Sequence, residues 1–178
     1  MIHDVAVAIR SLQAAGKIRT AMTVDTDVHH GNGTAAIFME DSTVFTLSIH
    51  QQNNYPEPKP PSDLDVNLAD GTGDEEYLEL LDKALAEAFH RFAPEMIFYI
   101  GGADPYREDQ LGGLWLSMRG LQERDALVFA EARLRGLPVA VAFAGGYARK
   151  VEDTVRIHAN TIIAAREAAA ARASRANL

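Results

Sequence analysis

Cysteine is absent from the 178-residue sequence, which excludes both disulfides and thiolate metal sites. Any metal ion must therefore be held by His, Asp or Glu. No stretch approaches the roughly 20 consecutive apolar residues of a transmembrane helix, and the N-terminal Met-Ile-His-Asp lacks the basic start and the apolar segment of a signal peptide. We therefore expect a cytoplasmic protein without a membrane partner.

Positive charge is also scarce. Lys and Arg number 17 against 25 Asp and Glu, which gives a net charge of −8. A nucleic-acid interface needs clustered Lys and Arg that neutralise phosphates. We therefore expect no direct binding of nucleic acid.

Four apolar segments rich in β-branched residues recur along the chain, and helical patterns separate most of them. The segments are continuous rather than alternating, which is typical of parallel strands that are covered on both faces. The predicted strands are Thr20–Val24, Thr43–Ile49, Met96–Ile100 and Pro138–Phe143, and the predicted helices are Asp4–Ala15, Asp74–Phe92, Leu121–Arg135 and Val151–Ala173. This order predicts a layered α/β fold with a mainly parallel central sheet. The length suits one domain over residues 1–178.

One segment interrupts the alternation of strands and helices. Gln51–Pro61 holds four of the seven prolines, and the Asp-, Asn- and Gly-rich segment Ser62–Gly73 follows it. Neither a helix nor a central strand tolerates so many prolines. We predict one long surface loop over this region, and Tyr55 within it is a candidate for lining a substrate entrance.

Two acids and an imidazole follow the first predicted strand at intervals of two residues, as Asp25, Asp27 and His29. In an extended chain, side chains two residues apart share a face. Gly31-Asn32-Gly33 then predicts a sharp turn. Carboxylates and an imidazole on one side suit a divalent transition metal, for which Zn²⁺ is the usual ion and Fe²⁺ a second choice. The pattern therefore points to metal-assisted hydrolysis.

Two later strand ends carry further reactive groups. Asp104 follows the third predicted strand, and Tyr147 follows the fourth through Gly145-Gly146. Open α/β sheets place their sites at the carboxyl ends of the strands, so we expect Asp27, His29, Asp104 and Tyr147 to converge. Three protein ligands with an open fourth position are typical of a catalytic metal.

Each of these features also has a simpler interpretation. Asp25 could cap its own turn, Asp104-Pro105 could start a turn or a helix, and Tyr147 could be a packing aromatic. His30 and His50 are assigned structural positions without a role in catalysis. The metal site is a hypothesis that depends on the combination of residues.

Taken together, these residues carry a family resemblance. The chain resembles the zinc-dependent deacetylases of the histone deacetylase and acetylpolyamine amidohydrolase superfamily. Its sequence is most similar to the class IV and bacterial branch. The matching segments are DTDVHHGNGTAAIF (Asp25–Phe38), VFTLSIH (Val44–His50), GGADPYREDQLG (Gly101–Gly112), LSMRGLQERD (Leu116–Asp125) and AGGYA (Ala144–Ala148). The resemblance implies a three-layer arginase-like α/β fold and the hydrolysis of an acetyl-lysine or acetylpolyamine amide.

Specific roles follow from the resemblance, position by position. It implies zinc ligands at Asp27, His29 and Asp104, and a catalytic Tyr147 whose hydroxyl stabilises the oxyanion. It also implies a structural K⁺ or Na⁺ site beneath the zinc. We further predict that Tyr55 and Gly145 contribute to substrate binding. The residues of the monovalent-cation site are Asp25, Asp27, His29, Ser48 and Ile49.

The sequence departs from the family in one respect. The general base of these enzymes is a histidine pair in an upstream Gly-His-His segment, and here His-His occurs once, at His29-His30. We therefore expect an N-terminally truncated family domain with impaired activity, because a placed base contributes roughly 10²–10⁴ in rate. The alternative is a non-catalytic metal-binding fragment or interaction module.

Two further expectations follow. Missing first strands would leave a sheet edge that pairs with another copy or with an N-terminal partner chain. A binuclear manganese ureohydrolase on the same fold is disfavoured, because Tyr106 stands where that chemistry needs a second carboxylate after Asp104.

Overall fold

The computed structural model describes residues 2–176, and within them it contains a five-stranded, all-parallel sheet. Its strands are β1 (Ala21–Asp25), β2 (Val44–Gln51), β3 (Leu64–Leu68), β4 (Met96–Gly102) and β5 (Val139–Ala144), in the order β3-β2-β1-β4-β5. The helices are α1 (Asp4–Ala14), α2 (Asn32–Phe38), α3 (Asp74–Arg91), α4 (Met118–Leu134) and α5 (Val151–Ala176). The predicted α/β fold class is confirmed. Residues 1, 177 and 178 of the predicted single domain lie outside the described part, and the domain assignment stays a prediction.

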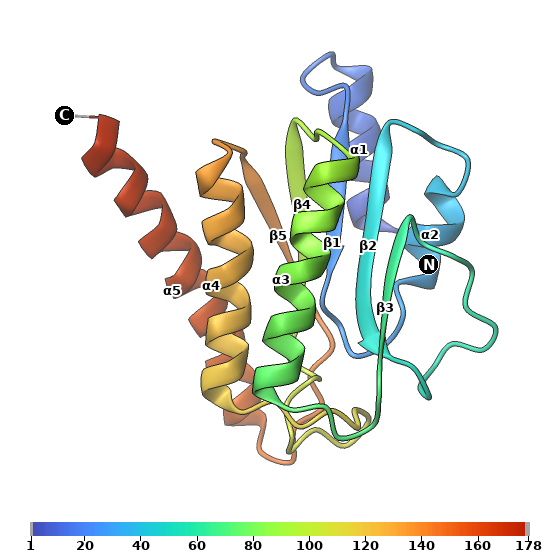
Figure 1. Cartoon of the computed structure of the whole chain (residues 1–178), viewed down its shortest axis with the longest axis vertical. Helices are drawn as coiled ribbons and strands as arrows, with labels where there is room; N and C mark the ends of the chain where they lie inside the picture. The colour runs from blue at the N-terminus through green and yellow to red at the C-terminus, as the bar shows by residue number, and fades with distance from the viewer. Residues whose placement is uncertain (1, 177–178) are drawn as a thin grey trace.

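Helices cover both faces of the sheet, so that the fold has three layers (Figure 1). On one face, Met22 and Leu47 of the sheet pack in a core with residues of α3, α4 and α5. On the other face, Ala21 and Phe98 pack in a second core with Ile9 of α1 and with α2. Every residue of β1 and β2 is buried. Burial on both faces explains the continuous apolar sequences of these strands.

The prediction of one long loop over Gln51–Gly73 is wrong at Leu64–Leu68, which forms β3 parallel to β2. This strand lies at the end of the sheet and alternates apolar with polar residues, so its sequence is more polar than that of a central strand. Asp63 helps to fix its start, because the carboxylate accepts hydrogen bonds of 2.8 Å from the backbone N–H and the hydroxyl of Thr46.

The loops that follow the strands gather at one edge of the sheet, the lower edge in Figure 1. Asp25, the last residue of β1, pairs in register with Ser48 of β2 and Ile100 of β4. The backbone N–H of Thr26 donates to the Ile100 carbonyl at 3.0 Å. The register therefore places the segment after β1 directly beside the segment after β4.

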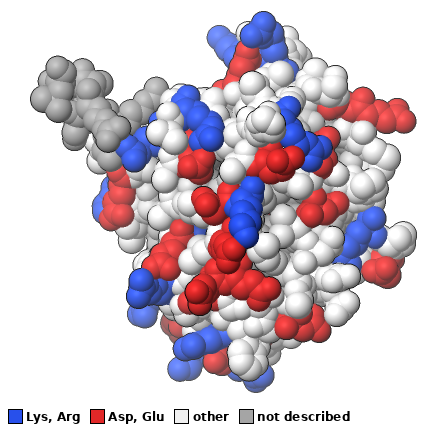
Figure 2. Space-filling view, viewed as in Figure 1, with Lys and Arg blue, Asp and Glu red and all other residues white. Residues whose placement is uncertain are grey.

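Lys and Arg side chains are scattered among acidic ones on the face shown in Figure 2. Acidic groups also open α3, whose first turn carries Asp74, Glu75 and Glu76. Negative charge at a helix N-terminus is favourable for the helix dipole. Among residues 2–176, no helix combines the length and the apolar character needed to cross a bilayer.

Candidate metal centre

Three side chains from two strand ends meet at the carboxyl edge of the sheet. The Nδ1 atom of His29 lies 2.9 Å from Asp27 Oδ1 and 3.3 Å from Asp104 Oδ2. One donor atom of each residue lies within 4.8 Å of the others. The predicted convergence of two carboxylates and one imidazole is therefore present in the geometry.

Backbone N–H groups fix the two carboxylates in place. Asp27 accepts hydrogen bonds of 2.8 Å from the backbone N–H groups of both His29 and Gly145. Asp104 Oδ1 accepts one of 2.9 Å from the backbone N–H of Val28. Asp104 Oδ2, by contrast, is buried and has no hydrogen-bond partner. A buried oxygen left in this way, beside an imidazole and a second carboxylate, fits the donor set of a divalent transition ion.

The charges of the cluster depend on one another. The carboxylates of Asp104 and Asp27 raise the pKa of His29 to about 10. Burial raises the pKa of Asp104 to about 6, although His29 acts in the opposite direction. Burial also acts to raise the pKa of Asp27, but hydrogen bonds from His29 outweigh it and the pKa is lowered. Several acids are thus held close together, an arrangement that a bound cation would stabilise.

Two glycines allow the backbone to approach these carboxylates closely. A Cβ atom on Gly145 would lie 1.7 Å from Asp104 Oδ2 and 2.7 Å from Asp27 Oδ2. A Cβ atom on Gly102 would lie 2.6 Å from the Asp27 Cα. The Gly145 carbonyl also accepts a hydrogen bond of 2.6 Å from Ala103, which joins the ends of β4 and β5. These positions therefore accommodate only glycine without movement.

The predicted monovalent-cation residues share Asp27 and His29 with this cluster. Asp25 is 7% exposed and accepts a hydrogen bond of 3.1 Å from the backbone N–H of Asp27. Burial, followed by the charge of Asp27, raises the pKa of Asp25 well above its usual value. Ser48 is buried opposite Asp25 on β2, and Ile49 follows it. The role of this group stays a prediction.

The two aromatic residues of the predicted site are more exposed. Tyr147 is 48% exposed, and its backbone N–H donates a hydrogen bond of 2.6 Å to Asp109 Oδ2. Asp109 also accepts hydrogen bonds from the backbone N–H groups of Leu111 and Gly112. Its carboxylate therefore joins the loop after β4 to the loop after β5. Tyr55 is 70% exposed, with its ring centroid 6.5 Å from that of His29. Convergence of the Tyr147 hydroxyl with the cluster stays a prediction.

Sequence reasoning missed a fully buried ion pair that supports the centre. Arg124 on α4 is 0% exposed and donates hydrogen bonds of 2.8 and 2.9 Å to Asp125 Oδ1. It also donates one of 2.6 Å to the Gly102 carbonyl, at the end of β4. Helical spacing would have indicated this burial, since Leu121 and Val128 on the same face lie three and four residues away from Arg124.

The sequence model of the histone deacetylase domain matches residues 1–162. The chain belongs to the histone deacetylase family. A protein of Picosynechococcus sp. is 40% identical over 94% of the chain and 56% of its own length. Histone deacetylase 2 of Arabidopsis thaliana is 32% identical over 89% of the chain and 41% of its own length. This chain therefore spans about half the length of these relatives.

Solved structures agree with the family assignment. An acetylpolyamine aminohydrolase from Burkholderia pseudomallei is 25% identical and superposes with a TM-score of 0.79. The match covers 92% of the chain and 49% of that protein. The resemblance to the histone deacetylase and acetylpolyamine amidohydrolase superfamily is confirmed. Histone deacetylase family proteins are generally metal-dependent, and this chain has residue groups that could hold a metal ion.

Proposed function

We propose that this chain is the metal-binding part of a zinc-dependent amidohydrolase of the histone deacetylase type. The substrate would be an acetylated lysine or polyamine, and hydrolysis of its amide would release the free amine and acetate. The observation that carries the proposal is the meeting of Asp27, His29 and Asp104 at the carboxyl edge of the sheet, with donor atoms within 4.8 Å. Zinc is the proposed ion, and Fe²⁺ suits the same donor set.

The proposed roles follow from where the residues lie. Asp27, His29 and Asp104 would hold the ion, whose chemistry is Lewis-acid polarisation of a carbonyl and activation of water. Tyr147, on the loop after β5, would donate its hydroxyl proton in a hydrogen bond to the charge that develops on the amide oxygen. Tyr55 would line the substrate entrance, since it is 70% exposed and its ring centroid lies 6.5 Å from that of the proposed ligand His29.

A test of this function measures hydrolysis of a fluorogenic acetyl-lysine substrate by the metal-loaded chain. We expect slow turnover that a chelator abolishes and added Zn²⁺ restores. Tyr147→Phe is expected to lower kcat by about 10²–10³-fold, because it removes one donor to the oxyanion. Tyr106→Phe also deletes one hydroxyl but lies outside the proposed centre, so it should retain the rate of the unchanged chain.

The second candidate function is that of a non-catalytic metal-binding fragment. It is suggested by the single His-His pair, of which His29 belongs to the metal cluster, so that a free pair for the general base is lacking. Stoichiometric zinc without any turnover would support this alternative. Turnover that Tyr147→Phe leaves unchanged would count against the proposed role of the phenol.

We also propose that β5 pairs with another chain, either a second copy or an N-terminal partner. In the described sheet, β5 is hydrogen-bonded only to β4, and Phe143 on it is 52% exposed. An uncovered edge strand is a template for association.

We expect light scattering to show self-association that increases with concentration and decreases in Phe143→Lys. Leu134→Lys, at an exposed position on α4, is the matched control. A monomer at every concentration would contradict pairing between copies.

A further inference from the structure

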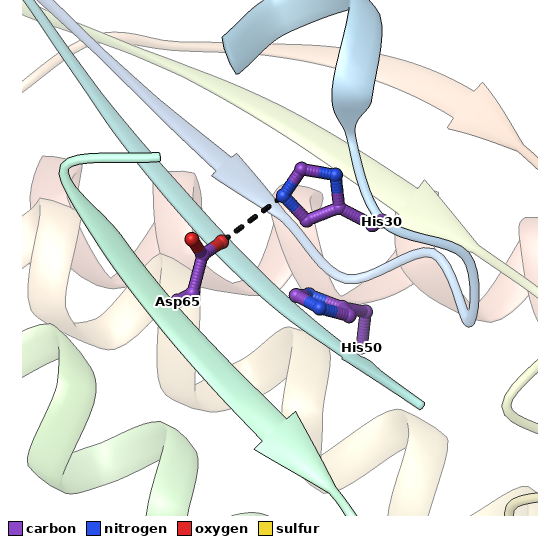
Figure 3. Close-up of side chains that lie close together, drawn as sticks. All are labelled: His30, His50 and Asp65. Atoms are coloured by element: carbon purple, nitrogen blue, oxygen red, sulfur yellow. Dashed lines mark hydrogen bonds and ion pairs between the residues drawn. The ribbon is translucent and has the colours of Figure 1, made fainter. Parts of the chain in front are cut away.

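A second group of metal-capable side chains also includes a residue of the segment that follows β1. His30 from this segment, His50 from β2 and Asp65 from β3 come together (Figure 3). One donor atom of each lies within 4.8 Å of the others. His30 is adjacent to His29 in sequence, but the two clusters have no residue in common.

The cluster is closely packed and mostly buried. His30 Nε2 lies 3.2 Å from Asp65 Oδ1, and the ring centroids of His30 and His50 are 4.6 Å apart. His50 is 0% exposed, whereas the Asp65 side chain is 23% exposed. Access from solvent is therefore through Asp65, and the imidazoles lie behind it.

Neighbouring groups orient two of the three side chains. His50 Nδ1 lies 3.0 Å from the Ser48 hydroxyl, and Asp65 Oδ2 accepts a hydrogen bond of 2.9 Å from the backbone N–H of Ser62. Metal-binding histidines and carboxylates are characteristically held through their second polar atom in this way. His50 Nε2 is left buried without a hydrogen-bond partner, as is Nδ1 of His30. Hydrogen bonds within the protein therefore leave one nitrogen of each histidine unsatisfied, whereas His30 Nε2 is hydrogen-bonded to Asp65 Oδ1.

We propose that His30, His50 and Asp65 form a second binding site for a divalent transition metal ion. Two imidazoles and one carboxylate are a nitrogen-rich donor set that favours such an ion over Mg²⁺ or Ca²⁺. Donor atoms around a tetrahedral zinc ion with bonds of about 2.0–2.1 Å lie about 3.3 Å apart, close to the 3.2 Å that separates His30 from Asp65.

The site would have a structural consequence. A metal ion here joins β2 and β3 to the segment after β1, which also carries His29 of the first centre. Because the three donors come from separate parts of the chain, binding stabilises the folded state and not the unfolded one. The bound ion would therefore raise the melting temperature and hold the His29 segment in place.

The test uses variants of the full chain that isolate each site. Asp104→Asn disables the first centre, so any stoichiometric zinc that remains reports on the second. Asp65→Asn removes the charged ligand of the second site, while the amide oxygen can still accept the hydrogen bond from Ser62. Metal-free protein is titrated with Zn²⁺, and bound metal is measured by elemental analysis alongside the melting temperature. Asp63→Asn is the matched control, because Asp63 lies in the same segment but bonds to Thr46.

We expect two zinc ions per unchanged chain, one in Asp104→Asn, one in Asp65→Asn and none in the double variant. Zinc should raise the melting temperature of Asp104→Asn but not that of the double variant, and Asp63→Asn should keep both ions. Loss of all zinc in Asp104→Asn would overturn the second site. Zinc that persists in the double variant would also overturn it, because that ion lies elsewhere. The proposal of the first centre is tested separately, because Asp65→Asn protein without bound zinc would contradict that centre and not the second site.

Discussion

Replacing Arg124 by methionine is expected to lower the free energy of unfolding by about 3–5 kcal/mol. The substitution leaves the Asp125 carboxylate, which is 0% exposed, without its cation. Breaking a buried ion pair from one side is costly because the remaining charge stays in a medium of low polarity. For a protein of this size, the loss corresponds to a decrease of about 6–20 °C in melting temperature. Thermal and urea unfolding followed by circular dichroism would measure it.

The matched control is an arginine on the same helix that is exposed to solvent. Arg119 pairs with Glu123 at 2.7 Å, but its side chain is 83% exposed. Solvent weakens such pairs, so Arg119→Met should change the stability by no more than about 0.5 kcal/mol. If Arg124→Met were equally mild, the buried pair would not be an important support of the fold.

The same substitution should also disturb the candidate metal centre. Arg124 donates to the Gly102 carbonyl at the end of β4, two residues before Asp104. Asp125 in turn accepts hydrogen bonds of 2.5 Å from Tyr99 and 2.6 Å from Thr161, so the network reaches from β4 to α5. Arg124→Lys keeps the charge but cannot reproduce the planar fork of the guanidinium. We expect an intermediate loss of stability for it.

The central strands were predictable from sequence because both of their faces are covered. Every residue of β1 is buried, so the strand appears in the sequence as a mostly apolar segment without helical periodicity. The edge strand β3 was not predictable in this way, since only one of its faces packs against the core. Helix α2 was also missed, because Gly31-Asn32-Gly33 is typical of a turn and the helix has only 7 residues.

The candidate site was predictable where its residues follow a local rule. Asp25, Asp27 and His29 follow one another at intervals of two after a strand, although β1 ends at Asp25 and the chain bends over Asp27–His29 instead of staying extended. Asp104 follows a second strand, whose carboxyl end the parallel topology places at the same edge of the sheet. The contacts of His30 with Asp65 and of Arg124 with Gly102 obey no such rule. They join segments 35 and 22 residues apart, and depend on side-chain directions that only the packed structure provides.

Gly145→Ala is expected to abolish stoichiometric metal binding at the first centre, and with it any metal-dependent turnover. The added methyl group would overlap Asp104 Oδ2, which lies 1.7 Å from its position. Either this carboxylate moves or the Gly145 backbone shifts away from it. A shift of the backbone would break the 2.8 Å hydrogen bond from the Gly145 N–H to Asp27. Loss of such an orienting hydrogen bond alone costs about 10–100-fold in metal affinity, and displacement of a proposed ligand adds to it.

The control is Gly73→Ala, because a Cβ atom at Gly73 meets nothing within 4 Å and the backbone there has a negative φ of −100°. This variant should bind zinc like the unchanged chain, as measured by titration against a competing chelator. A Gly145→Ala protein that keeps full zinc affinity at the first centre, measured in an Asp65→Asn background, would contradict the expected disturbance of the Asp104 and Asp27 carboxylates. Intact folding of both variants, verified by circular dichroism, separates a local effect on the carboxylates from general unfolding.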